Sequence, residues 1–163
     1  MALAKYACSA LAVITLLILG MSNSYAEQKW YLLRHFEKEL GDNPKLTEQG
    51  HSRARALATY FRYIPLSGVY STDYRRTQQT AADTATLHKQ AVVTYAPSEP
   101  EQFIDEISVL SHVLVVGHSN TIPDLVRALG GEAKDLTERD YGRLFIVTRD
   151  GDSVMTQSVI IPF

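Results

Sequence analysis

The stretch YLLRHFEK, residues 31–38, changes abruptly from an apolar run to Arg-His and then to charged residues. A buried strand whose C-terminal end opens into a site has this pattern. A second run, VLVVGH over residues 113–118, also ends in a histidine. In open α/β sheets, ligands bind just outside the carboxyl ends of the strands. We therefore expect His35 and His118 to lie at one rim of a sheet.

Apolar segments of two periods alternate along the rest of the chain. Strands are expected over residues 29–33, 68–71, 91–95, 113–116, 144–148 and 154–161. Helices are expected after the N-cap Thr47, over 75–87 and 99–110, and from Asn120 to Gly130. The order is βα repeated four times and then a hairpin around Gly151. It predicts an α/β three-layer sandwich, with a mostly parallel sheet, helices on both faces and a C-terminal hairpin.

Residues 1–26 have the features of a secretory signal peptide. Lys5 supplies a basic start, an apolar region follows over residues 10–20, and small residues precede the expected cleavage after Ala26. An uncleaved anchor is the alternative, although the apolar region is short for a span of about 20 residues. We expect an exported protein, periplasmic or else secreted, without stable membrane association after cleavage, and a single domain over 27–163.

Composition excludes several other classes of protein. The formal net charge of the 163 residues is −2, which is too mild for nucleic acid or an anionic surface as partner. The single cysteine, Cys8, lies in the signal region, so disulfides do not contribute to the mature domain. The histidines lack zinc-type spacing, so no metal is expected. The oligomeric state is not readable from the sequence.

The residues at the expected strand ends favour phosphoryl chemistry. Arg34 and Arg76 each carry a planar, permanently charged guanidinium group, which can donate two parallel hydrogen bonds to the oxygens of a phosphate. A neutral imidazole can be a nucleophile, and a second histidine can be cationic or transfer a proton. Asn120 is either a simple N-cap or part of a helix N-terminus that donates backbone hydrogen bonds to an anion bound beside the two histidines.

Four fragments in order resemble the histidine phosphatase superfamily, which has the phosphoglycerate-mutase-like fold. They are LRHFE at 33–37, LTEQG at 46–50, YSTDYRRTQQTA at 70–81 and VVGHSNT at 115–121. The form RHxEK is similar to a small bacterial branch. The resemblance implies that His35 becomes phosphohistidine, that Arg34, Arg76 and His118 hold phosphate, and that no cofactor is needed. Arg75, beside Arg76, is expected to be solvated.

The chain departs from the family pattern at two points. Phe36 replaces the usual glycine after the first histidine, and we expect its ring to narrow or wall the pocket. No motif locates the acid that protonates the leaving group. Glu99 and Glu101 are candidates by position, and Glu37 is closer to His35 in sequence. Without an acid, phosphohistidine and aryl phosphates would be the favoured substrates.

The sequence therefore predicts a phosphatase that acts on a small phosphorylated substrate through His35. The alternative hypothesis is a non-catalytic protein that binds phosphate or another anionic ligand in the same pocket. Phe36 and the missing acid are the support for this alternative. The helix after Thr47 adds a further expectation, namely that Arg53, Arg55 and Arg62 lie on its solvated face.

Overall fold

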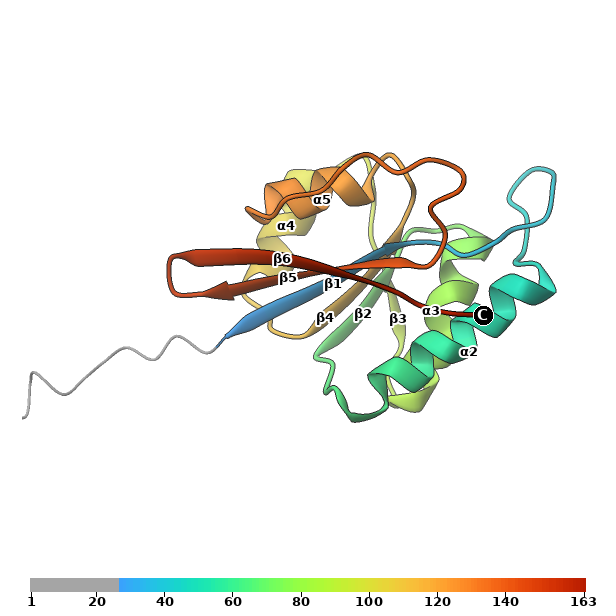
Figure 1. The fold of residues 1–163 in the computed structure, drawn as a ribbon, viewed down its shortest axis with the longest axis horizontal. Coiled ribbons are helices and arrows are strands. Elements are labelled where there is room, and N and C mark those ends of the chain that lie inside the picture. The colour runs from blue at the N-terminus through green and yellow to red at the C-terminus, as the bar shows by residue number, and fades with distance from the viewer. Residues whose placement is uncertain (1–26) are drawn as a thin grey trace, which may run out of the picture.

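The computed structural model describes residues 27–163 and has a six-stranded sheet at its centre, covered by helices on both faces (Figure 1). The strand order is β3-β2-β4-β1-β5-β6. β1 to β4 run parallel, whereas β5 and β6 form an antiparallel hairpin beside β1. The strands are β1 (Gln28–Arg34), β2 (Gly68–Ser71), β3 (Val92–Thr94), β4 (Val113–Gly117), β5 (Arg143–Asp150) and β6 (Ser153–Ile160). This confirms the predicted α/β class and the C-terminal hairpin.

The helices divide between the two faces of the sheet, as Figure 1 shows. α2 and α3 cover one face with the short turn η1, and α4 and α5 cover the other. Their bounds are α2 (Glu48–Tyr60), η1 (Phe61–Tyr63), α3 (Arg75–Leu87), α4 (Pro100–Ser108) and α5 (Ile122–Ala128). None of the helices in this part of the chain has the length and apolar character needed to cross a membrane.

Side chains of β1 alternate between two apolar cores. Tyr31 and Leu33 pack with α2 and α3, whereas Trp30 and Leu32 pack with α4 and α5. Successive side chains of a strand point to opposite faces of a sheet, so a central strand covered on both faces is apolar throughout. The continuous apolar run that opens the domain follows from this central position.

α2 begins as its sequence predicts. The Oγ1 of the N-cap Thr47 accepts a hydrogen bond from the Gly50 backbone N at 3.1 Å. Gly50 has no room for a side chain, because a Cβ there would collide with the carbonyl oxygen of Glu37. The loop after β1 is thus packed tightly against the first turn of α2.

Arg53 is buried, so the prediction that it lies on the solvated face of α2 is wrong. Only 5% of Arg53 is exposed, and its Nη2 lies 2.7 Å from Glu37 Oε1. Its Nη1 also donates to the carbonyl oxygen of Ile161. A buried guanidinium is tolerated where a carboxylate and further acceptors compensate its charge. Arg53 therefore joins the loop after β1 to the C-terminal segment.

The parallel register brings three strand ends to one edge of the sheet. Arg34 is paired with Gly117, and Ser71 is paired with Val116. The pairing continues beyond β1, since the His35 N donates to the Gly117 carbonyl oxygen at 2.9 Å. Residues that follow β1, β2 and β4 consequently lie close together, although they are far apart in the sequence.

Candidate active site

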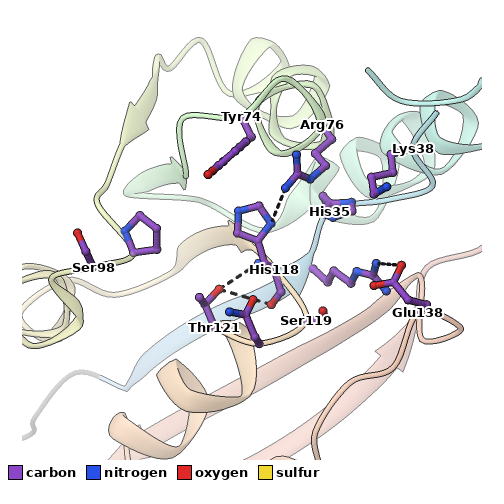
Figure 2. Close-up of a pocket in the computed structure, with 12 residues that line it drawn as sticks. His35, Lys38, Tyr74, Arg76, Ser98, His118, Ser119, Thr121 and Glu138 are labelled. Atoms are coloured by element: carbon purple, nitrogen blue, oxygen red, sulfur yellow. Dashed lines mark hydrogen bonds and ion pairs between the residues drawn. The ribbon is translucent and has the colours of Figure 1, made fainter. Parts of the chain in front are cut away.

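A cavity of about 480 Å³ opens at this edge of the sheet, as Figure 2 shows. The side chains of its wall are mostly polar and cationic, with a single carboxylate. They are Arg34, His35, Lys38, Tyr74, Arg76, Pro97, Ser98, His118, Ser119, Asn120, Thr121 and Glu138. The structure thus brings together the four residues that the sequence singled out at strand ends, and it places Asn120 beside them.

His35 is buried at the base of the cavity, with 3% of its surface exposed. Its Nδ1 lies 2.8 Å from the carbonyl oxygen of Phe36. A carbonyl oxygen can only accept, so Nδ1 carries the proton and Nε2 carries the lone pair. Burial, together with the cations Arg34 and Arg76, lowers the pKa of His35 to about 3. His35 is therefore a neutral imidazole at physiological pH, with Nε2 available as a nucleophile.

The Phe36 side chain does not line the cavity, so the expected aromatic wall is absent. The ring is fully buried in the core between the sheet and helices α2 and α3. The Phe36 backbone N donates to Thr80 Oγ1 at 3.1 Å, which fixes this turn against α3. The backbone of Phe36 therefore orients His35, while the Phe36 side chain packs in the hydrophobic core.

His118 faces His35 with ring centroids 5.6 Å apart. Its Nδ1 lies 3.4 Å from Arg76 Nη2, and its Nε2 lies 3.1 Å from Thr72 Oγ1. A guanidinium can only donate, so Nδ1 accepts and the Nε2–H donates to Thr72. Burial, followed by the charges of Arg76 and Arg34, lowers the pKa of His118 to about 4. His118 is therefore neutral while the cavity holds no anion.

A chain of hydroxyl groups fixes this tautomer of His118. The Thr72 hydroxyl donates to Thr77 Oγ1 at 3.0 Å, and the Thr77 hydroxyl lies 2.8 Å from the carbonyl oxygen of Tyr74. Thr72 and Thr77 are both fully buried, so water does not compete for these bonds. With its proton committed to Thr77, Thr72 can only accept from His118.

Thr72→Val is expected to lower kcat/KM for phosphate esters about tenfold, because it leaves the buried His118 Nε2–H without an acceptor. Losing that acceptor also disfavours the imidazolium form of His118. As the pH rises, His118 should therefore lose its proton, and phosphate affinity should fall, at a lower pH than in the wild type. Thr72→Ser keeps the hydroxyl and is the matched control, expected within about threefold of the wild type. Steady-state kinetics and phosphate titrations over pH check this. Equal losses in both variants would contradict the proposed orienting role.

Arg34 is held by a loop between α5 and β5. Its Nη1 donates to the Thr137 carbonyl oxygen at 2.9 Å, and its Nη2 lies 2.7 Å from Glu138 Oε2. The guanidinium carbon lies 4.3 Å from the centroid of the Tyr141 ring. These contacts set the plane of the guanidinium, and they leave Nε for another acceptor.

The Nε atoms of Arg34 and Arg76 are buried and have no hydrogen-bond partner among the described residues. Buried donors without acceptors are costly. The guanidinium carbon of Arg76 lies 4.5 Å from the centroid of the Tyr74 ring. Two oriented arginines with unused donors beside two neutral histidines form a site suited to a phosphoryl group.

Three carboxylates predicted for the site do not line the cavity. Glu37 faces away, because Arg53 binds its carboxylate through Nε and Nη2. Glu99 precedes α4 and Glu101 lies in its first turn, where both are exposed to solvent. Pro97 and Ser98 line the cavity in their place.

Several residues of the site were not predicted from the sequence. Glu138 and Tyr141 lie in an irregular loop that carries no motif, and Thr72 was quoted only as part of a longer fragment. Lys38 belongs to the opening stretch, and its charge beside Arg34 and His35 was the available signal. Among residues 27–163, no group of three or more His, Cys, Asp or Glu is arranged to hold a metal ion.

Comparison with known proteins agrees with the fold. Residues 30–98 match the family model of the histidine phosphatase superfamily (branch 1). This segment includes Arg34, His35 and Arg76. This part of the chain thus resembles the histidine phosphatase superfamily. The fold of the described residues agrees with that match.

Solved structures of phosphatases have the same fold. The protein histidine phosphatase SixA complexed with tungstate superposes with a TM-score of 0.67 and 15% identity, covering 82% of this chain and 97% of that one. A putative phosphohistidine phosphatase SixA from Nakamurella multipartitia gives a TM-score of 0.61 and 20% identity, covering 85% of this chain and 98% of that one. A putative alpha-ribazole-5'-phosphate phosphatase from Escherichia coli gives 0.65 and 16%, covering 83% and 96%. A search of curated proteins finds no match.

Proposed function

We propose that this protein hydrolyses a phosphomonoester or phosphohistidine through a covalent phosphohistidine on His35. The observation that supports this most directly is the hydrogen bond from His35 Nδ1 to the Phe36 carbonyl oxygen. It leaves the lone pair on Nε2, in a cavity that also contains Arg34 and Arg76.

In the first step, Nε2 attacks the phosphorus and forms an N–P bond. The bond from phosphorus to the leaving atom breaks, and its electron pair departs with the leaving group. The phosphoryl oxygens accept hydrogen bonds from Arg34, Arg76 and His118, which disperse their charge. Entry of a phosphate dianion raises the pKa of His118, so His118 takes a proton from solution and donates through Nδ1.

In the second step, a water molecule attacks the phosphorus of the phosphohistidine. The N–P bond breaks, its electron pair returns to Nε2, and inorganic phosphate leaves. The protons of the attacking water are shared between the phosphate and the solvent. His35 is regenerated as the neutral imidazole, so no other cofactor or reactant is consumed.

The single carboxylate in the cavity wall is poorly suited to donate a proton. Glu138 forms an ion pair with Arg34 at 2.7 Å, and 75% of its side chain is exposed. Glu99 and Glu101 remain candidates only if they approach the cavity when substrate binds. We therefore propose leaving groups that need little protonation, such as the imidazole of phosphohistidine or the phenol of an aryl phosphate.

The test is phosphate release from a panel of alkyl phosphates, aryl phosphates and phosphohistidine, with rapid acid and base quenching of radiolabelled protein. We expect release, and a protein-bound phosphoryl group that is stable to base and labile to acid. A folded protein that binds inorganic phosphate without releasing it from any substrate would favour the binding protein. The missing acid still supports this alternative, whereas Phe36 does not.

We also propose that the protein is exported to the periplasm and cleaved after Ala26. The signal sequence lies outside the described residues, so the proposal rests on the sequence pattern alone. N-terminal sequencing of the exported protein tests it, and a start at Glu27 is the expected result. Retention of residues 1–26 on the exported chain would contradict cleavage.

A further inference from the structure

A smaller cavity of about 90 Å³ adjoins the catalytic cavity. It is lined by Tyr95, Pro97, Pro100, Thr121, Asp124 and Leu125. Pro97 and Thr121 line both cavities, so the two lie next to each other. Thr121 Oγ1 also accepts a hydrogen bond from the His118 backbone N at 3.1 Å, which places the junction directly beside the phosphate-binding histidine.

The small cavity is apolar and its walls are rigid. Tyr95 and Leu125 are buried, and the Tyr95 ring is stacked on Phe103 with centroids 3.9 Å apart. Pro97 and Pro100 form the exposed rim, where their cyclic side chains have little freedom. Asp124 is the one charged residue, and Arg127 compensates its carboxylate at 2.5 Å. A preformed apolar cavity of this kind favours an uncharged, rigid occupant.

Thr121, which lines both cavities, lies on the far side of His118 from His35, as does Ser98 (Figure 2). In-line displacement requires the leaving atom to be opposite the attacking Nε2 of His35. We infer that a phosphoryl group bound beside His35 and His118 directs its leaving group toward Pro97 and Thr121, which line both cavities.

We propose that this cavity is a subsite for a single planar aromatic ring on the leaving group, either an imidazole or a phenol. This inference rests on the proposed phosphatase function. A water molecule takes up about 30 Å³ in the liquid, so the cavity has room for roughly three waters or one ring. Phenolate delocalises the electron pair that it receives, and an imidazole whose second nitrogen carries a proton leaves as a neutral ring. Both suit a catalytic cavity whose one lining carboxylate, Glu138, is bound to Arg34.

Binding of phosphonates tests the subsite without requiring turnover. Methylphosphonate, benzylphosphonate and 1-naphthylmethylphosphonate are compared by calorimetry on the purified protein. We expect benzylphosphonate to bind about tenfold more tightly than methylphosphonate, which corresponds to burial of roughly 55 Å² of ring at ~25 cal/mol/Å². The naphthyl compound should lose this gain, because its second ring exceeds the cavity. Equal affinity of methyl- and benzylphosphonate would overturn the subsite.

Two variants locate the effect in the small cavity. Leu125→Ala removes its floor and Pro100→Ala removes part of its exposed rim, whereas Pro65→Ala changes an exposed proline elsewhere. In Leu125→Ala and Pro100→Ala, the benzyl preference should fall below about threefold while methylphosphonate affinity is retained. Because Leu125 is buried, Pro100→Ala keeps the test decisive if Leu125→Ala does not fold. A preference unchanged in Pro100→Ala and in any folded Leu125→Ala would overturn the assignment.

Rates of hydrolysis distinguish whether the ring bound in the small cavity is the imidazole of phosphohistidine or the phenol of phosphotyrosine. A higher kcat/KM for phosphohistidine than for phosphotyrosine identifies imidazole as the occupant, and the reverse identifies phenol. Faster hydrolysis of phosphoserine than of both would overturn the aromatic subsite. A protein that binds none of the phosphonates and forms no phosphoprotein would refute the proposed function itself, which is a different outcome from binding without ring preference.

Discussion

Replacing His35 by alanine is expected to lower kcat by on the order of 10⁴-fold or more and to abolish the acid-labile phosphoprotein. Removal of a covalent nucleophile has effects of this size, because the two-step route is lost and only binding and electrostatic stabilisation remain. Phosphate affinity should change far less, since Arg34, Arg76 and His118 still surround the cavity. Single-turnover quenching and phosphate titration measure the two quantities separately.

The His35 result needs a control for general effects of losing a histidine. His51→Ala changes a histidine on α2 that does not line the cavity, and it should retain full turnover and labelling. His35→Gln fills more of the buried space than alanine and guards against collapse of the site. If His35→Ala still accumulates a base-stable phosphoprotein, another nucleophile is used and the proposed mechanism is wrong.

The parts of the structure that follow local rules could be predicted from the sequence. α3 spans residues 75–87 as expected, and the Thr47 N-cap marks the start of α2. Apolar strands that end in Arg-His and Gly-His indicated the rim of the site, because parallel strands bring their carboxyl ends together. Hydrophobic period, caps and strand termini are all encoded within a few residues.

Phe36 and Arg53 show where local rules fail. Continued strand alternation from Leu33 would place residue 35, not residue 36, on the side of α2 and α3. The chain leaves the strand at Arg34, and this turn buries Phe36 in the core while His35 lies in the cavity. Arg53 became internal because Glu37, from a different element, offered a carboxylate. Both outcomes depend on tertiary contacts that periodicity does not describe.

The contacts between Arg34 and the loop that joins α5 to β5 could not be predicted from the sequence for a related reason. Thr137, Glu138 and Tyr141 contact Arg34 across more than 100 residues of chain. Hydrogen bonds to a backbone carbonyl and stacking on a tyrosine need no particular motif. Glu99 and Glu101 were predicted as acids from their position in the sequence alone. Glu99 precedes α4 and Glu101 lies in its first turn, where both are exposed and neither lines the cavity.

Arg76→Met is expected to lower kcat/KM for phosphate esters by about 10³-fold, whereas Arg75→Met should remain within about threefold of the wild type. Arg76 lines the cavity and has a buried Nε without a partner, but Arg75 is exposed and lies outside it. Removing one preorganised donor from a site of developing charge costs about 10²–10³-fold, and here a full cation is lost as well. The adjacent pair shares the same helix start, so general effects on α3 cancel.

Loss of Arg76 should also change the pH dependence, which a purely structural role would not explain. The charge of Arg76 contributes to lowering the pKa of His118, so the pKa of His118 should rise in Arg76→Met. His118 would then hold its proton to higher pH, and the residual phosphate affinity should persist to higher pH than in the wild type. Arg76→Lys keeps the charge without the planar fork, so it should recover part of the rate and leave the His118 pKa low. Equal activity of Arg76→Met and Arg75→Met would remove Arg76 from the proposed phosphate site.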